Sequence, residues 1–333
     1  MQVKFKVYVL KARILLRHDY LGLGAVLSKV LVTGGAGFIG RYTCRALVAA
    51  GHDVIIYDNF SNASHDGLNG LGRVIEADIR DRDSLLDAVA NADHVVHLAA
   101  LVSVPISIEM PKQVFDINVA ATEQLFDICR ETGFAGRVIY ASSASVYSND
   151  LGGNFKEEWA TGQGLLSPYA SSKFMNEVQA GIYRTCYGQK TTAFRFFNVY
   201  GAGQDPKSPY SGVITRLLEA RDEGKKFTIF GDGSITRDYI AVEDIAGAIA
   251  LLAGFDGDAP RVMNLGTGQQ TTLNELVEAW QDATGQGLDY SYGPARSGDQ
   301  QHSCADIALV QKTLPAWQPV SLAEGLVRWV GAV

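Results

Sequence analysis

The stretch Lys29–Arg41, KVLVTGGAGFIGR, constrains the fold of this chain more than any other feature. Residues Val30 to Thr33 are apolar or β-branched, as in a strand buried on both faces. A glycine cluster follows, and Arg41–Ala50 then shows the apolar periodicity of a helix. A strand that turns sharply into a helix directs bare backbone N–H groups and the positive end of the helix dipole at one point. Such a point suits a phosphate.

The glycines have the spacing of a dinucleotide-binding loop, read as Gly35-x-Gly37-x-x-Gly40 or as Gly34-x-x-Gly37-x-x-Gly40. One glycine permits the tight turn, one lets a pyrophosphate approach the backbone, and one lets the helix pack closely on the strand. Spacing alone is weak evidence, because a glycine-rich loop without a ligand has the same pattern. The strand before it, the helix after it and an acidic residue downstream make the signal specific for dinucleotide binding.

That acidic residue is Asp58, at the end of a second expected strand, Asp53–Tyr57. A carboxylate there accepts hydrogen bonds from both ribose hydroxyls of an adenosine and repels a 2′-phosphate. The cofactor expected is therefore NAD and not NADP. The alternative is a solvated aspartate in a strand-end turn.

Strands and helices continue to alternate along the chain. Further strands are expected at 73–77, 93–100, 136–141 and 191–197, with helices at 84–90 and 111–133. This order predicts an α/β fold, a doubly wound parallel sheet (Rossmann) with a smaller C-terminal α/β substrate domain. We predict an NAD-binding domain at 29–196, to which 237–254 returns, and a substrate domain at 197–333. The basic segment 1–28 is an extension of unknown role.

Composition excludes several other classes of protein. With 333 residues, 47% hydrophobic and 20% charged, the chain has the profile of an ordinary globular protein. A net charge of −7 argues against a nucleic-acid partner. No apolar run approaches the roughly 20 residues needed to span a bilayer, so no membrane partner is expected. The 4 cysteines have no paired spacing, which indicates reduced thiols, no metal site and a cytoplasmic location.

Three residues form a candidate catalytic group. Tyr169 and Lys173 lie one turn apart in a helix that Ser167-Pro168 opens. A phenol titrates near 10 and is a weak base at neutral pH, but a nearby ammonium and an oxidised nicotinamide favour the phenolate. Ser143, at a strand end, is placed to orient a substrate hydroxyl. Together they suit hydride removal from a secondary alcohol. In the strand before them, His97 is interpreted as a packed residue and not as a catalyst.

With these motifs in place, the sequence from Lys29 to the C-terminus resembles the extended short-chain dehydrogenase/reductase family, and within it the UDP-hexose 4-epimerases. The resemblance depends on the segments Thr33–Gly40, Tyr57–Asn59, His97–Ala100, Ser142–Tyr147, Tyr169-x-x-x-Lys173 and Phe197–Gly201. It implies that Ser143, Tyr169 and Lys173 are catalytic. It also implies a homodimer, with 111–133 and 169–187 in a shared helix bundle.

The resemblance implies two sets of binding residues. The first holds a tightly bound NAD: Gly34, Gly37, Phe38, Ile39, Gly40, Asp58, Asn59, Asp78, Ile79, Ala99, Ala100, Asn118, Tyr169, Lys173 and Phe196. The second binds the UDP-sugar: Ser103, Ser143, Asn198, Val213, Phe230, Arg237, Arg296, Asp299 and Ser303. Guanidinium groups match the oxygens of a diphosphate. The alternatives are a surface ion pair for each arginine, for example Arg237 with Asp238, and a core position for Phe230.

Two details select among related reactions and substrates. Dehydratase relatives place an acid beside the catalytic hydroxyl, whereas this chain has Ala144 and Ser145 there. Where a tyrosine would crowd a 2-acetamido group, the chain has Ser303. With Gln204-Asp205-Pro206-x-x-x-Tyr210, this favours UDP-GlcNAc and UDP-GalNAc and leaves UDP-glucose and UDP-galactose open. The alternatives are another nucleotide-sugar reductase or epimerase of the family, and a non-catalytic NAD-binding protein.

Overall fold

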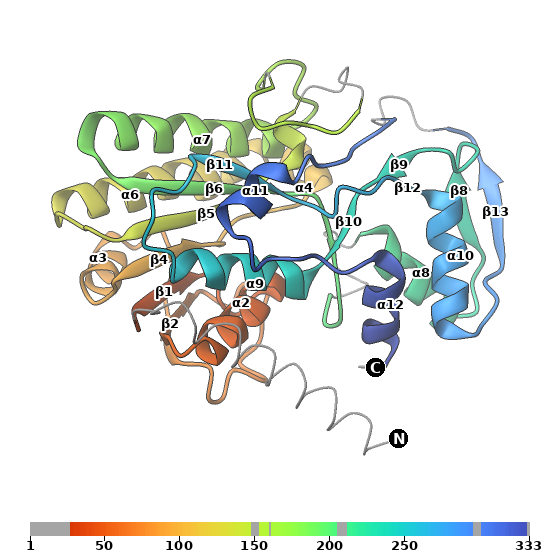
Figure 1. Ribbon diagram of the computed structural model, residues 1–333, viewed down its shortest axis with the longest axis horizontal. Helices are drawn as coiled ribbons and strands as arrows, with labels where there is room; N and C mark the ends of the chain where they lie inside the picture. Colours follow the sequence, from red (N-terminus) through yellow and green to blue (C-terminus); the bar gives the residue numbers. More distant parts are fainter. Residues whose placement is uncertain (1–26, 148–152, 160, 205–211, 296–300, 332–333) are drawn as a thin grey trace.

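The computed structural model describes residues 27–147, 153–159, 161–204, 212–295 and 301–331. Its main feature is a seven-stranded sheet in the order β11-β6-β5-β4-β1-β2-β3 (Figure 1). Every neighbouring pair is parallel, which confirms the predicted doubly wound fold. The strands are β1 (Lys29–Thr33), β2 (Asp53–Asp58), β3 (Arg73–Glu76), β4 (His94–His97), β5 (Arg137–Ser143), β6 (Lys190–Phe196) and β11 (Val262–Leu265).

Helices cover both faces of this sheet. On one face lie α2 (Phe38–Ala49), α9 (Val242–Ala253) and α11 (Ala308–Thr313), which pack with Val30 and Val32. On the other lie α3 (Arg82–Ala90), α6 (Ala121–Glu131) and α7 (Pro168–Tyr187), which pack with Leu31. Successive β1 residues point to opposite faces. The strand is therefore apolar throughout because both of its faces are buried.

The helices depart from expectation in two places. Helix α2 begins at Phe38, earlier than Arg41, so its first turn lies inside the glycine motif. The single helix expected at 111–133 consists of α5 (Pro111–Val114), a π-helical turn η1 (Phe115–Ala120) and α6. An additional short helix, α4 (Val104–Glu109), precedes it. Such π-helical turns are often found at functional sites.

The rest of the chain forms a second layered unit beside the carboxyl ends of the strands (Figure 1). It contains three two-stranded sheets, β7 (Asn198–Tyr200) with β10 (Tyr239–Ala241), β8 (Phe227–Phe230) with β13 (Tyr290–Gly293), and β9 (Thr236–Arg237) with β12 (Thr271–Thr272). Its core surrounds Trp280. Its helices are α8 (Val213–Asp222), α10 (Leu273–Thr284) and α12 (Leu322–Val330).

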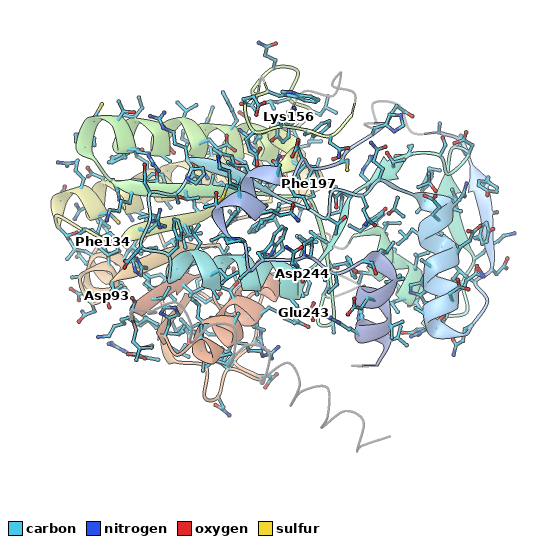
Figure 2. The ribbon with its side chains drawn as sticks, in the orientation of Figure 1. Asp93, Phe134, Lys156, Phe197, Glu243 and Asp244 are labelled. Carbon is cyan, nitrogen blue, oxygen red and sulfur yellow. The ribbon has the colours of Figure 1, made fainter. Side chains whose placement is uncertain are left out.

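The two units are joined through the C-terminal half of the chain. Helix α9 packs against α2, and β11 adds a further strand to the large sheet, so the return to that sheet extends beyond 237–254. Near the start of α9, Asp244 accepts a hydrogen bond from the Val320 N–H at 2.9 Å. Figure 2 shows Asp244 and Glu243 at this junction. Within the described ranges, no helix has both the length and the apolarity to cross a bilayer.

Candidate active site

The glycine loop is shaped by close backbone approaches. Gly34 has φ +69°, and a Cβ there would lie 2.6 Å from the Ala99 nitrogen. A Cβ at Gly40 would overlap the Gly34 carbonyl oxygen. Gly37 is the N-cap of α2 and provides no side-chain cap, so the first-turn N–H groups of this twelve-residue helix have no side-chain acceptor there. The loop is therefore built for an external anion.

Asp58 closes the same loop from β2. Its carboxylate accepts hydrogen bonds from the Ala36 N–H at 3.0 Å and the Phe60 N–H at 2.9 Å. A carboxylate has about four acceptor sites, so Asp58 retains capacity for the ribose hydroxyls. Next to it, Asn59 donates to Asp78 at 2.8 Å. An ion pair with Arg80 holds the pKa of Asp78 well below its usual range.

A directional chain of hydrogen bonds connects the loop to the π-helical turn. Thr122 donates to the Asn118 carbonyl at 2.7 Å, so it must accept from His97 Nε2 at 2.9 Å. His97 Nδ1 then accepts from Thr33 Oγ1 at 2.7 Å. Burial lowers the pKa of His97 to about 3. His97 is thus a neutral, packed residue, as the sequence indicated.

Two predicted binding residues are engaged with the backbone. The buried Asn118 side chain accepts from the Leu101 N–H at 2.7 Å, and donates to the Leu101 carbonyl at 2.9 Å and to Ser172 Oγ at 3.0 Å. Ser103 is the N-cap of α4 and accepts from the Ile106 N–H at 3.2 Å. Both side chains fix the segment after β4, and their direct contacts with ligands stay predictions.

The structure brings the three candidate catalytic residues together. Ser143 ends β5, and Tyr169 lies in the first turn of α7, whose N-cap Ser167 accepts from the Ala170 N–H at 3.1 Å. Lys173 Nζ donates to the Ala141 carbonyl at 2.9 Å and lies 6.0 Å from the centre of the Tyr169 ring. The three side chains thus lie close together at one strand end, and their roles as base, tuning cation and orienting hydroxyl stay predictions.

The electrostatics of this group differ from the expectation for Tyr169. Burial raises the pKa of Tyr169, and a hydrogen bond with Ser143 only partly opposes that rise. Burial also lowers the pKa of Lys173 to about 8. Lys173 alone therefore does not lower the pKa of the Tyr169 phenol below its usual value. In the expected mechanism, the phenolate therefore depends on the other cation, an oxidised nicotinamide.

A buried ion pair that sequence analysis missed supports the catalytic group. Arg195 on β6 and Glu177 on α7 are joined at 2.7 Å and are 4% and 9% exposed. Glu177 also accepts from Ser142 Oγ at 2.5 Å, and it lies one turn after Lys173. These contacts tie α7 to the strand end that presents Ser143. An arginine between two phenylalanines of a buried strand was the available signal.

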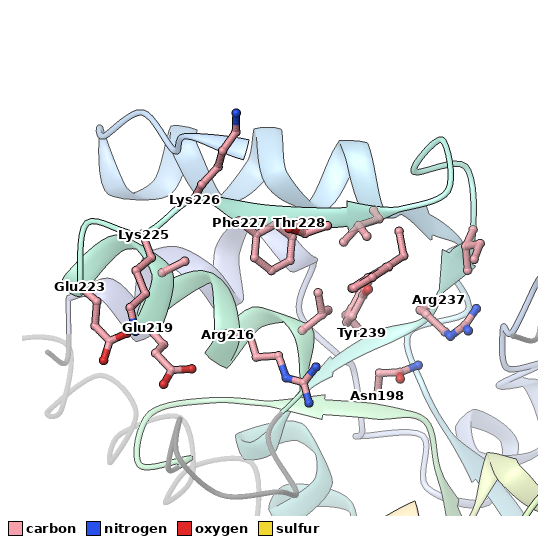
Figure 3. A pocket seen from close by; sticks show the side chains of 15 residues that line it. Asn198, Arg216, Glu219, Glu223, Lys225, Lys226, Phe227, Thr228, Arg237 and Tyr239 are labelled. Atoms are coloured by element: carbon pink, nitrogen blue, oxygen red, sulfur yellow. Dashed lines mark ion pairs between the residues drawn. The ribbon is translucent and has the colours of Figure 1, made fainter. Parts of the chain in front are cut away.

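The second unit contains a cavity of about 550 Å³. Four predicted substrate residues, Asn198, Val213, Phe230 and Arg237, line it together with Tyr239, and Figure 3 shows Asn198 and Arg237 at one end. Because Asp238 is fully buried, the specific surface ion pair of Arg237 with Asp238 is wrong.

The remaining predicted residues lie in several places. Ser303 is 3% exposed and is not part of the lining of this cavity, and Arg296 and Asp299 lie outside the described residues, as do 205–211. Phe196 and Ile79 are buried, and Ala99 and Ala100 follow β4. Across the described residues, no group of three or more His, Cys, Asp or Glu side chains is placed to hold a metal ion.

Comparison with known proteins decides the family. A model described as "NAD dependent epimerase/dehydratase family" matches residues 30–266. The chain belongs to this family. Membership confirms NAD as the cofactor, and the glycine cradle and Asp58 fit it. Tight retention of NAD stays a prediction.

Individual relatives agree with the expected resemblance to UDP-hexose 4-epimerases. The chain is 35% identical to a UDP-glucose 4-epimerase of Mycolicibacterium smegmatis, over 91% of this chain and 97% of the relative. A UDP-N-acetylglucosamine 4-epimerase of Methanobrevibacter ruminantium, solved with UDP-N-acetylmuramic acid, superposes with a TM-score of 0.84 at 34% identity, covering 92% and 97% of the two chains. A UDP-glucose 4-epimerase of Stenotrophomonas maltophila with NAD and formylated UDP-arabinopyranose gives 0.84 at 30% identity, covering 91% and 96%.

Proposed function

We propose that this epimerase-family protein inverts C4 of a UDP-hexose through a 4-keto sugar. The observation that supports this most directly is the convergence of Ser143, Tyr169 and Lys173 at the end of β5. That strand end shares an edge of the sheet with the glycine loop. A base, an orienting hydroxyl and a dinucleotide cradle are the parts that reversible oxidation of an alcohol requires.

In this mechanism the chain's own residues bind, orient and move one proton. Bound NAD supplies hydride acceptance from C4 and hydride return. The Tyr169 phenolate takes the proton from the sugar O4, Ser143 orients that oxygen by a hydrogen bond, and the Lys173 ammonium stabilises the phenolate. After the sugar turns over about its phosphate links, Tyr169 returns the proton to O4 of the inverted product. Anchoring through UDP alone permits this rotation.

The reaction is tested with purified protein and four UDP-hexoses, UDP-glucose, UDP-galactose, UDP-GlcNAc and UDP-GalNAc, without added cofactor. We expect NMR to show each pair interconverting at C4, with retained NAD recycled in place. Net release of NADH together with a keto product would contradict epimerisation and would indicate another oxidoreductase of the family. Binding of NAD without any sugar conversion would indicate a non-catalytic protein.

For the substrate, we propose UDP-GlcNAc and UDP-GalNAc, with the UDP-glucose pair as further substrates. The support is the residue type at Ser303, because the resemblance implies a sugar-pocket position there and serine is smaller than the tyrosine that would crowd a 2-acetamido group. One solved relative carries the name UDP-N-acetylglucosamine 4-epimerase. We expect Ser303→Tyr to lower the ratio of acetamido to non-acetylated turnover at least tenfold, and Ser303→Ala to leave that ratio within twofold. An unchanged ratio in Ser303→Tyr contradicts the assignment.

We also propose a cytoplasmic homodimer. Support for the dimer comes from an apolar stripe on α7, where Met175, Val178 and Ile182 are 39%, 50% and 53% exposed at helical spacing. Phe115, 50% exposed, lies on the adjacent π-helical turn. Light scattering after size exclusion should give the mass of two chains for the parent protein. The Val178→Glu variant should give the mass of one chain. All four cysteines are free, as the reducing cytoplasm requires.

A further inference from the structure

Arg216 is a charged residue of the cavity that the sequence analysis did not select. It lies in helix α8, one turn after Val213, and is exposed. Arg216 lines the cavity, and among the described residues none forms a hydrogen bond or ion pair with its guanidinium. In Figure 3 its side chain points toward the end where Asn198 and Arg237 lie. An arginine head in this position has its donors available for a ligand.

The other charges of the cavity make that end positive. At the outer end, Lys225 is paired with Glu223 at 2.7 Å, so this cation and this carboxylate neutralise each other. Glu219 lies one turn beyond Arg216 and, in Figure 3, does not point toward Asn198. Arg216 and Arg237 thus both lie at the Asn198 end, where Arg237 also donates to the Thr236 carbonyl at 2.8 Å. Two like charges around one cavity favour an anion between them.

We propose that Arg216 is a further diphosphate-binding residue, acting with Arg237 on the nucleotide of the substrate. This inference rests on the proposed function, because it assumes that a UDP-sugar occupies this cavity. A guanidinium fork matches the oxygens of a phosphate and makes charge-assisted hydrogen bonds. The chain has a net charge of −7, so a local group of arginines is needed to attract a dianion against that field. With the diphosphate held by these arginines, the substrate stays bound while its sugar changes orientation.

The test measures the binding of UDP by titration calorimetry. The binding of uridine is measured separately by ligand-observed NMR. Arg216→Ala should weaken UDP binding about 10-fold to 30-fold, the loss of one or two charge-assisted hydrogen bonds. Arg216→Lys should give an intermediate affinity, because an ammonium keeps the charge but not the fork. Uridine, which has no phosphate, should bind Arg216→Ala and the parent protein equally.

The matched control is Arg221→Gln, which removes a positive charge from the same helix. Arg221 pairs with Asp222 and does not line the cavity, so its UDP affinity should stay within twofold. An affinity of Arg216→Ala for UDP within twofold of the parent would overturn the proposal. An equal loss for uridine would also overturn it. If the parent protein binds no UDP at all, the proposed function itself fails, and this result is distinct from a failure at Arg216.

Discussion

Replacing Asp238 by asparagine should lower the free energy of unfolding, because four buried hydrogen bonds converge on its carboxylate. Asp238 is fully buried between β9 and β10. One carboxylate oxygen accepts from the Thr267 N–H and hydroxyl, both at 2.7 Å. The other accepts from the Gly268 N–H at 2.9 Å and the Ala305 N–H at 3.1 Å. This one side chain therefore joins three segments that are distant in the sequence.

The cost follows from the donors that surround the carboxylate. An asparagine amide has one acceptor oxygen and one NH₂ group, so in either orientation the NH₂ faces backbone N–H donors. The less costly orientation turns the NH₂ toward Thr267, whose hydroxyl can rotate to accept. The Thr267 N–H then loses its acceptor, at about 1–3 kcal/mol, and the remaining bonds lose their charge-assisted part, about 1 kcal/mol each. Burial raises the pKa of Asp238, so the neutral amide also avoids the cost of desolvating a charge, which offsets this second loss. The net cost is about 1–3 kcal/mol, against about 5–15 kcal/mol for a whole fold.

Urea unfolding followed by circular dichroism measures this loss. The matched control is Asp232→Asn, an exposed aspartate that accepts from the Ser234 N–H at 2.9 Å and should lose less than about 1 kcal/mol. The Asp238→Asn transition should occur at a clearly lower urea concentration than that of Asp232→Asn. Equal midpoints for the two variants would refute the reasoning, because they would show that the four buried hydrogen bonds contribute no more than one exposed turn.

Three further predictions concern the cofactor loop, a buried acid and the base. Gly40→Ala places a Cβ onto the Gly34 carbonyl and should abolish NAD retention, measured as nucleotide released on denaturation, whereas Gly247→Ala, in open space, should retain it. Burial raises the pKa of Asp244 from about 3.9 in the unfolded chain to about 7 in the folded protein. The contribution of this carboxyl to the free energy of unfolding is therefore fully present below about pH 4 and is lost as the pH rises through 7. Asp244→Asn should therefore gain up to about 4 kcal/mol in urea unfolding above pH 7 and little at pH 4; a pH-independent difference contradicts this. Tyr169→Phe should lower turnover by about 10²–10⁴ with UDP affinity unchanged, and a fully active variant would refute its role as the base.

The parts of the fold that could be predicted from the sequence are those with a local signal. Helix α7 begins at Pro168 as predicted, because Ser167 and Pro168 form a local signal for a helix N-terminus. The parallel sheet followed from the alternation of strands and helices. The π-helical turn within 111–133 could not be predicted. The apolar periodicity of the sequence does not distinguish hydrogen bonds four residues apart from hydrogen bonds five residues apart. Placement of β11 in the large sheet was missed because neighbours in a sheet are set by long-range packing.

The candidate site shows the same division. Motif residues such as Gly34, Asp58 and Tyr169 were found because their spacing is short and fixed. Arg195 and Glu177 were missed because each is an unremarkable charge until the fold brings the two together. Arg216 has no motif at all, and only the cavity identifies it. Residues that act through a distant partner therefore need the structure.

The raised pKa of Tyr169 links base strength to the occupancy of the site. The chain by itself half-buries Tyr169, whose phenol has a hydrogen bond with Ser143, and burial lowers the pKa of the neighbouring Lys173 to about 8. A neutral phenol cannot take a proton from an alcohol at neutral pH. An added positive charge in the dinucleotide cradle lowers the phenol pKa, since an opposite charge within a few ångströms favours the anion. In the proposed mechanism, the Tyr169 base is therefore effective when the cradle holds an oxidised cofactor, because burial raises the phenol pKa and the positive charge opposes that rise.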